Sequence, residues 1–301
     1  MRPYSPIPAG ARVALIAPAG PLRLPADLDR ALANAKTLDW EPVVADHVRE
    51  RAGYLAGSDA DRLADLNAAL NDDSIDAVWC LRGGYGAMRL LAGIDYDALR
   101  RRPKAIIGYS DITAVLCALQ TQCGLSGIHG PTARAKLTPF AERSLRAAAS
   151  GGDPCGVVSG ARTLVPGSAR GTLIGGNLAL LCAVHGTPYQ PDYNGAILVL
   201  EDVNEASYRI ERMLMQLRLS GDLQRCAAIA FGSFTNTGDS EDKGLGGTRS
   251  VAAVIKEAAV AVGVPSLAGV PVGHIDDQWS LPLGQHAELD ANEKRLTILW
   301  T

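Results

Sequence analysis

A serine at the junction of a predicted strand and a predicted helix is the residue best placed to act as a nucleophile. Ala105–Gly108 is short, apolar and β-branched, which predicts a buried strand, and residues 111–122 follow with helical periodicity. Ser110 lies between them, beside free helix N–H groups, as in a nucleophile elbow. The G-x-S-x-G pattern is only partly matched, because Ile112 stands where its last glycine would be. Serine also caps helices, so a structural role for Ser110 stays open.

A serine nucleophile needs a base, and histidine is the side chain whose ordinary pKa suits that task. His274 is the strongest candidate, because it ends a short apolar segment, follows a glycine and enters a polar loop. A hydrogen bond to Asp276 or Asp277 would instead make it structural. His129, in Gly-Ile-His-Gly-Pro, is a second candidate. The other three are expected at the surface (His47 and His286) or in a structural turn (His185).

The base needs a carboxylate to hold its far nitrogen, and three acidic residues compete for this role. Glu201 closes an apolar predicted strand, where a charge is costly unless it is paired or lies at the rim. Asp202 and Glu205 are its rivals. An ion pair with arginines of the following helix would give Glu201 a structural role.

Two backbone N–H groups are candidates for an oxyanion hole. The N–H of Asp111 follows directly from the elbow, and that of Gly84 belongs to the glycine-rich turn 82–86 after another predicted strand. That turn could also be only a tight turn or a phosphate-binding loop. It lacks a P-loop lysine and the full G-x-G-x-x-G spacing, which argues against nucleotide binding.

Strands and helices alternate through the first 122 residues, which predicts a parallel sheet covered by helices on both faces. In such a sheet functional residues collect at the carboxyl ends of strands, where Ser110 and the turn 82–86 both lie. We expect strands at 12–17, 42–45, 76–81 and 105–108, and helices at 24–38, 58–70, 87–91 and 111–122.

The second half of the chain is less regular, and we expect it to form a smaller β-rich α+β domain. Turn-rich composition around 150–170 predicts a linker at 151–169 between domains at 1–150 and 170–301. The expected elements are strands at 196–200 and 227–231, helices at 207–219 and 248–262, a Gly/Asp-rich loop at 236–247 and short strands through 267–299.

Composition limits the kinds of partner. The 301 residues are 47% hydrophobic with a net charge of −3, an ordinary globular profile without the basic surplus that nucleic-acid binding needs. We find no apolar run of the roughly 20 residues that a membrane helix needs. The N-terminus lacks the apolar core of a signal peptide, which predicts a cytoplasmic location. Six scattered cysteines without a C-x-x-C pair predict buried thiols rather than disulfides or metal ligands.

Taken together, these motifs resemble the LD-carboxypeptidases (muramoyltetrapeptide carboxypeptidases), serine peptidases whose close relatives include the microcin-immunity peptidases. The resemblance covers nearly the whole chain, with the motifs in the family's order and at similar spacing. The segments that carry it are Leu15–Gly20, Arg82–Ala87, Gly108–Ala114, Gly171–Leu178, Leu198–Glu205, Arg209–Leu214, Gly273–Ile275 and Leu281–Gly284.

This resemblance implies a triad of Ser110 as nucleophile, His274 as base and Glu201 as orienting acid. It implies a flavodoxin-like N-terminal domain, a β-rich C-terminal domain and a site between them. The implied activity is release of the terminal D-Ala from murein tetrapeptides in cytoplasmic peptidoglycan recycling, by a homodimer without a cofactor. His129 lies where the family does not demand a histidine. Arg82 is one candidate for binding the product carboxylate.

Two other functions compete with this one. A microcin-immunity-type peptidase would cleave acyl-sulfamoyl or peptidyl adenylates and would need an aromatic platform for the nucleobase. Trp279, near His274, is a candidate, but packing with the Leu-Pro-Leu-Gly segment 281–284 would explain this residue equally well. A non-catalytic module would bind a nucleotide or flavin at the turn 83–86 and leave Ser110 without a chemical role.

Overall fold

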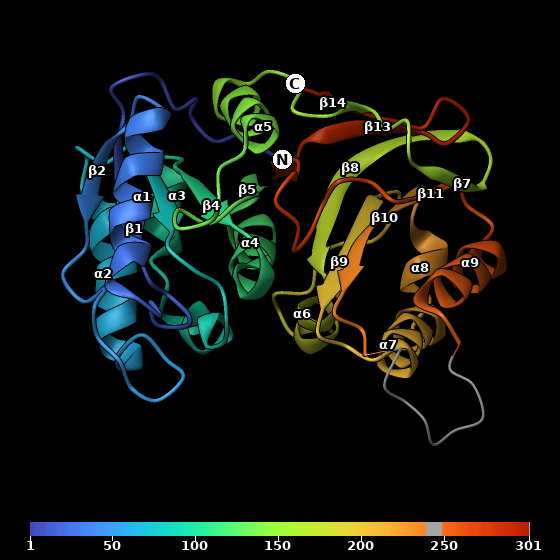
Figure 1. Ribbon diagram of the computed structural model, residues 1–301, viewed down its shortest axis with the longest axis horizontal. Coiled ribbons are helices and arrows are strands. Elements are labelled where there is room, and N and C mark those ends of the chain that lie inside the picture. The colour runs from blue at the N-terminus through green and yellow to red at the C-terminus, as the bar shows by residue number, and fades with distance from the viewer. Residues whose placement is uncertain (239–248, 301) are drawn as a thin grey trace.

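Two β-sheets with flanking helices lie side by side in the computed structural model, which describes residues 1–238 and 249–300 (Figure 1). The first sheet has six strands in the order β12-β5-β4-β3-β1-β2. Its five N-terminal strands are parallel and follow the flavodoxin-like order 2-1-3-4-5. The predicted α/β class is confirmed. The strands are β1 (Arg12–Ile16), β2 (Glu41–Val44), β3 (Ala77–Cys80), β4 (Ala105–Gly108), β5 (Gly127–His129) and β12 (Leu281–Leu283).

Two helices of the N-terminal half, α1 (Pro25–Thr37) and α2 (Asp59–Asn71), form where apolar periodicity predicts them, whereas α3 and α5 were not predicted. Ser58 caps α2 by accepting a hydrogen bond from the Asp61 N–H, and the Asp61 carboxylate in turn accepts from the Ser58 hydroxyl. The predicted helix 111–122 is less regular: a 3₁₀ turn at Ser110–Ile112, α4 at Thr113–Ala118, and a π-helical segment at Leu119–Cys123. The helices are α1 (Pro25–Thr37), α2 (Asp59–Asn71), α3 (Tyr96–Arg101), α4 (Thr113–Ala118) and α5 (Pro139–Ser150), with a 3₁₀ helix at Ala87–Gly93.

The second sheet has eight strands in the order β6-β14-β13-β8-β9-β10-β11-β7, of which β8 to β11 run parallel. Its strands are β6 (Gly156–Val157), β7 (Arg162–Val165), β8 (Ser168–Asn177), β9 (Ile197–Val203), β10 (Ala228–Thr235), β11 (Ser266–Ala268), β13 (His286–Asp290) and β14 (Arg295–Leu299). Its helices are α6 (Leu178–Val184), α7 (Ser207–Leu219), α8 (Asp222–Arg225) and α9 (Val251–Val262). Most of the predicted loop at 236–247 lies outside the described residues.

The two halves exchange structure across their boundary. β6 and β7 lie within the predicted linker 151–169 but join the eight-stranded sheet, and β12 from the C-terminal half pairs with β5 of the other sheet. The domain boundaries at 150 and 170 therefore stay a prediction, and each sheet includes a strand from beyond them.

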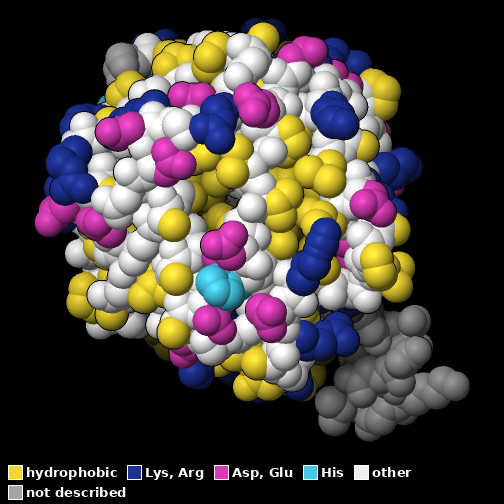
Figure 2. All heavy atoms as spheres, turned by 90° about the vertical axis from the view of Figure 1, so that its left-hand side faces the viewer, with side chains coloured by type: hydrophobic (Ala, Val, Ile, Leu, Met, Phe, Trp, Pro, Cys, Tyr) yellow, Lys and Arg dark blue, Asp and Glu magenta, His cyan; other side chains and the backbone are white. Residues whose placement is uncertain are grey.

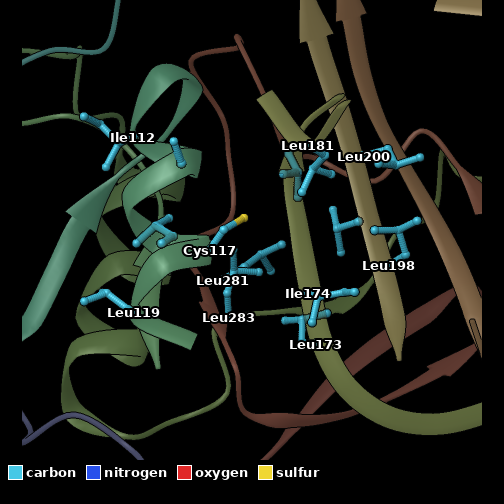
Figure 3. Packing of buried hydrophobic residues seen from close by; sticks show 14 of the residues in the cluster. Ile112, Cys117, Leu119, Leu173, Ile174, Leu181, Leu198, Leu200, Leu281 and Leu283 are labelled. Atoms are coloured by element: carbon cyan, nitrogen blue, oxygen red, sulfur yellow. The ribbon is translucent and has the colours of Figure 1, made fainter. Parts of the chain in front are cut away.

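A continuous apolar core fills the space between the halves. Figure 3 shows side chains of α4, β8, β9 and β12 meeting there, with Leu281 and Leu283 between Cys117 on one side and Ile174 on the other. Close packing of this kind transmits small shifts rigidly, so residues contributed by the two sheets keep a fixed relation. All six cysteines are free thiols.

The surface mixes charges of both signs. On the face formed by the left-hand side of Figure 1, Lys and Arg alternate with Asp and Glu without a continuous basic patch (Figure 2). Within residues 1–238 and 249–300 no helix has the length and apolar character that crossing a membrane requires.

Candidate active site

Ser110 occupies a strained turn directly after β4. Its φ of 63° lies in the left-handed region, which non-glycine residues adopt at a cost of about 1–3 kcal/mol. Gly108 ends β4, and an added Cβ there would lie 3.0 Å from Ile112, so glycine lets the strand end pack closely against the turn. Ile112 is fully buried, so the residue in place of the motif's last glycine serves the core. The elbow is thus built by Gly108 and Ile112 together.

His274 and Glu201 form a hydrogen-bonded pair. His274 Nδ1 lies 2.8 Å from Glu201 Oε2, and the Glu201 side chain is 0% exposed against 20% for His274. Glu201 is near the end of β9, and His274 follows Gly273, whose φ is 120°. A Cβ at Gly273 would lie 2.9 Å from Glu201 Cβ and from Oε2, so glycine lets the two backbones approach. Because Nδ1 faces the carboxylate, Nε2 is left for proton transfer.

Ser110 and His274 line one cavity of about 390 Å³ between the two sheets. The Tyr109 ring, next to Ser110 in the chain, lies 4.8 Å from the His274 ring between centroids. No hydrogen bond joins Ser110 Oγ to the imidazole within the described residues, and such bonds are commonly long until substrate binds. The structure therefore brings Ser110, His274 and Glu201 to one site, although 73 residues separate the acid from the base.

The two predicted oxyanion donors come from neighbouring strand ends. Gly84, with φ 114°, lines the cavity, and among the described residues its N–H donates to no backbone carbonyl. The buried Asp111 carboxylate accepts a hydrogen bond from the Ala87 N–H at 2.8 Å, which ties the elbow to the glycine turn. Burial raises the pKa of Asp111. A Cβ at Gly83 would lie 3.0 Å from Ser110 Cβ, so this turn packs directly against the nucleophile candidate.

The rival carboxylates are engaged elsewhere. Asp202 is buried and accepts hydrogen bonds from Asn177 Nδ2 and from the Ala179 and Val203 N–H groups, which fixes the start of α6. Burial raises its pKa to about 6. Glu205 lies 3.6 Å from Arg209. Within the described residues neither contacts His274, whose carboxylate partner is Glu201.

The other histidines have structural surroundings. His129 is fully buried, and neither ring nitrogen has a partner in the described residues. Burial lowers its pKa to about 4, partly offset by Glu201 and reinforced by His274, which makes it a poor base near neutral pH. His47 lies 2.7 Å from Asp65 and His185 lies 3.0 Å from Asp222. His286 is exposed on β13.

Of the two roles that the sequence leaves open for Trp279, the structure agrees with packing and not with an aromatic platform at the site. Trp279 is 4% exposed and does not line the cavity of Ser110. It packs in the core because it precedes the segment Ser280–Leu283, which enters the first sheet through β12. The aromatic ring beside His274 is Tyr109.

His129 should leave a signature in the pH dependence of stability. The folded protein keeps it uncharged down to about pH 4, whereas the unfolded chain protonates it near its ordinary pKa of 6.5. The unfolded state then binds more protons between these values, so the His129 contribution to stability rises with pH. We compare the unfolding free energy of wild type with that of His129→Leu. The difference, wild type minus variant, should increase by about 2 kcal/mol from about pH 5 to about pH 7. Urea unfolding at both pH values measures this, and a pH-independent difference would contradict it.

Gly83→Ala should disturb the site more than the fold. Its new Cβ would lie 3.0 to 3.2 Å from Ser110 Cβ, Tyr109 O and Ser110 Oγ, so the nucleophile must move by a few tenths of an ångström. We expect kcat to fall by about 10- to 100-fold, because misplacement of reacting groups is costly. The control is Gly160→Ala, where an added Cβ meets nothing within 4 Å. Equal activity of the two variants would show that Gly83 does not position Ser110.

The sequence interpretation missed several polar residues of the cavity. Arg23, Arg134 and Asn177 line it together with the anticipated Arg82. Their positions in the sequence could have indicated them, because each lies at or after the carboxyl end of a strand: Arg23 after β1, Arg134 after β5 and Asn177 at the end of β8.

Comparison with known proteins gives the family. Residues 13–130 match the LD-carboxypeptidase N-terminal domain and residues 170–289 match the LD-carboxypeptidase C-terminal domain. The chain is 38% identical to the murein tetrapeptide carboxypeptidase of Pseudomonas aeruginosa over 96% of each chain. It is 36% identical to the probable murein peptide carboxypeptidase of Bacillus subtilis, over 96% of this chain and 92% of that one.

Among solved structures, the microcin C7 self-immunity protein MccF superposes with a TM-score of 0.89, covering 99% of this chain and 98% of that one. Its sequence identity of 22% makes this a likeness of fold. The family matches and the full-length relatives together show that the chain belongs to the LD-carboxypeptidase family of serine hydrolases.

Proposed function

We propose that this protein releases the terminal D-Ala from murein tetrapeptides, with Ser110 as nucleophile, His274 as base and Glu201 as orienting acid. The observation that carries the proposal is the buried Glu201–His274 pair opening onto the same cavity as the strained Ser110 elbow. The relatives named for murein peptides support the substrate class. A cytoplasmic homodimer remains an expectation from the family resemblance.

The proposed reaction begins when His274 Nε2 takes the Ser110 hydroxyl proton as Oγ attacks the scissile carbonyl carbon. Glu201 holds the imidazole tautomer through Nδ1 and stabilises the imidazolium. The N–H groups of Gly84 and Asp111 hold the oxyanion, each worth about 3 kcal/mol in related chemistry. His274 then protonates the departing amine of D-Ala as the C–N bond breaks. Water, deprotonated by the same imidazole, hydrolyses the acyl-enzyme and returns Ser110 to its starting state.

The test is to incubate the purified protein with a murein tetrapeptide and, in parallel, with an aminoacyl-sulfamoyl adenosine. Release of D-Ala from the tetrapeptide, with the adenosine compound intact, supports the proposal. Cleavage of the adenosine compound alone would assign the microcin-immunity type of activity instead. A protein that cleaves neither, resists a fluorophosphonate at Ser110 and carries a nucleotide or flavin would be the non-catalytic module.

A further inference from the structure

Three arginines line the cavity on the side of the first sheet, and we call them the arginine wall: Arg23, Arg82 and Arg134. They come from three different loops, after β1, β3 and β5. The carboxyl ends of parallel strands meet at one edge of the sheet, so residues far apart in sequence gather there beside Ser110. The wall is therefore part of the same site as the nucleophile.

The positive charge of this wall is only partly balanced. The one carboxylate paired with it in the described residues is Asp27, at 3.4 Å from Arg134 Nη1. Asp27 also accepts the backbone N–H groups of Arg23 and Leu24. Burial lowers the pKa of Arg82, and the neighbouring charges of Arg23 and Arg134 lower it further. Three guanidinium groups against one carboxylate leave a net positive charge on this side of the cavity.

Arg134 is partly exposed, and its guanidinium is only loosely held by Asp27, its carboxylate partner. Its side chain is 26% exposed, its contact with Asp27 is long, and its Nε has no hydrogen-bond partner within the described residues. Arg82 by contrast donates from Nη1 to the Pro21 carbonyl at 2.6 Å. A partly exposed guanidinium whose ion-pair contact is long keeps N–H donors for an anionic ligand in the cavity.

The residues that line the cavity from the second sheet are acidic or neutral rather than basic. They include Asn177, Asp202, Asn204 and Glu205, from the ends of β8 and β9 and the loop before α7. A substrate with one anionic end is thus oriented by the field across the cavity, with that end toward the first sheet.

We propose that Arg134, assisted by Arg82, binds the terminal carboxylate of the departing residue and so restricts cleavage to the last peptide bond. The inference rests on the proposed function. In a carboxypeptidase only one residue separates the scissile carbonyl from the terminal carboxylate, a span of about 4 Å. Arg82 directly precedes Gly83, which packs against Ser110, and Arg134 shares their cavity, so the wall lies beside the nucleophile. A planar guanidinium matches a carboxylate through two parallel hydrogen bonds.

The experiment compares one tetrapeptide with a free C-terminal carboxylate and the same peptide with a C-terminal amide. The proteins are wild type, Arg134→Ala, Arg134→Lys and the control Arg143→Ala, an exposed arginine of α5 outside the cavity. We expect wild type to prefer the acid. Arg134→Ala should lose about 10- to 100-fold in kcat/KM on the acid, mainly through KM, with little change on the amide. Arg134→Lys should recover part of the preference, and Arg143→Ala should behave as wild type.

The possible results distinguish failure of the carboxylate-binding role of Arg134 from failure of the proposed carboxypeptidase function. Wild-type turnover that is indifferent to the amide, or an Arg134→Ala loss of equal size on both peptides, would overturn the carboxylate role while leaving the peptidase intact. An equal loss would mean that Arg134 only supports the fold, which a lowered melting temperature would show. Absence of turnover of the acid by wild type would overturn the proposed function and this inference with it.

Discussion

Ser110→Ala is expected to reduce D-Ala release by on the order of 10⁶-fold, because removing a serine nucleophile leaves only the oxyanion site and substrate binding to act. The fold should remain intact. Alanine has the same Cβ and tolerates the left-handed φ of this position as serine does, and no described residue relies on a hydrogen bond from the Ser110 hydroxyl. The measurement is D-Ala release from the tetrapeptide, followed by coupled oxidation of the free D-amino acid.

The matched control is Ser150→Ala, an exposed serine at the end of α5. Both variants should unfold at the wild-type temperature, and the control should keep full activity. A fluorophosphonate should label wild type at Ser110 and leave the variant unlabelled, as peptide mass spectrometry can show. D-Ala release by Ser110→Ala near the wild-type rate would refute the nucleophile assignment.

Glu201→Gln is expected to lower kcat by about 10⁴-fold, because the amide that replaces the carboxylate no longer holds the productive imidazole tautomer. Glutamine has nearly the same shape, so packing around this fully buried side chain is preserved. The amide also removes the negative charge that stabilises the imidazolium formed during attack. The measurement is steady-state hydrolysis of the tetrapeptide.

Glu205→Gln is the comparison, because Glu205 lines the same cavity but pairs with Arg209. We expect it to lose far less activity than Glu201→Gln. Adding Glu201→Gln to Ser110→Ala should cause little further loss, since members of a triad act as a unit. If Glu205→Gln proved the more damaging change, Glu205 rather than Glu201 would be the orienting acid.

Several local elements of the first half were predictable because each is specified by neighbours in sequence, although β5, α3 and α5 were not predicted. The alternating apolar runs around β1, β3 and β4, and the Ser58 cap of α2, depend on contacts within a few residues. The Ser110 elbow belongs to this group, since Gly108 and Ile112 lie two residues on either side of it. The flavodoxin-like order of the strands came from the family resemblance and agrees with the structure.

Long-range pairings were not predictable in the same way. β12 joins β5 across more than 150 residues of chain. β6 and β7 lie in a segment whose composition is typical of a linker, yet they form the two edge strands of the second sheet. Turn residues mark where the chain bends, but they do not say which distant strand offers a free edge. The π-helical end of the helix after Ser110 was also missed, since its apolar pattern fits an ordinary helix.

The sequence by itself determined the kinds of group available for catalysis: a serine at an elbow, glycines beside it, and histidines and acids that follow apolar strands. Residue spacing left Glu201, Asp202 and Glu205 open, and only the family resemblance implied Glu201. The contact between Glu201 and His274, the isolation of His129 and the gathering of the arginine wall were decided by the tertiary structure. The physical reason is that residue type and spacing fix chemistry and local conformation, whereas burial and distance between side chains exist only after the two sheets have packed together.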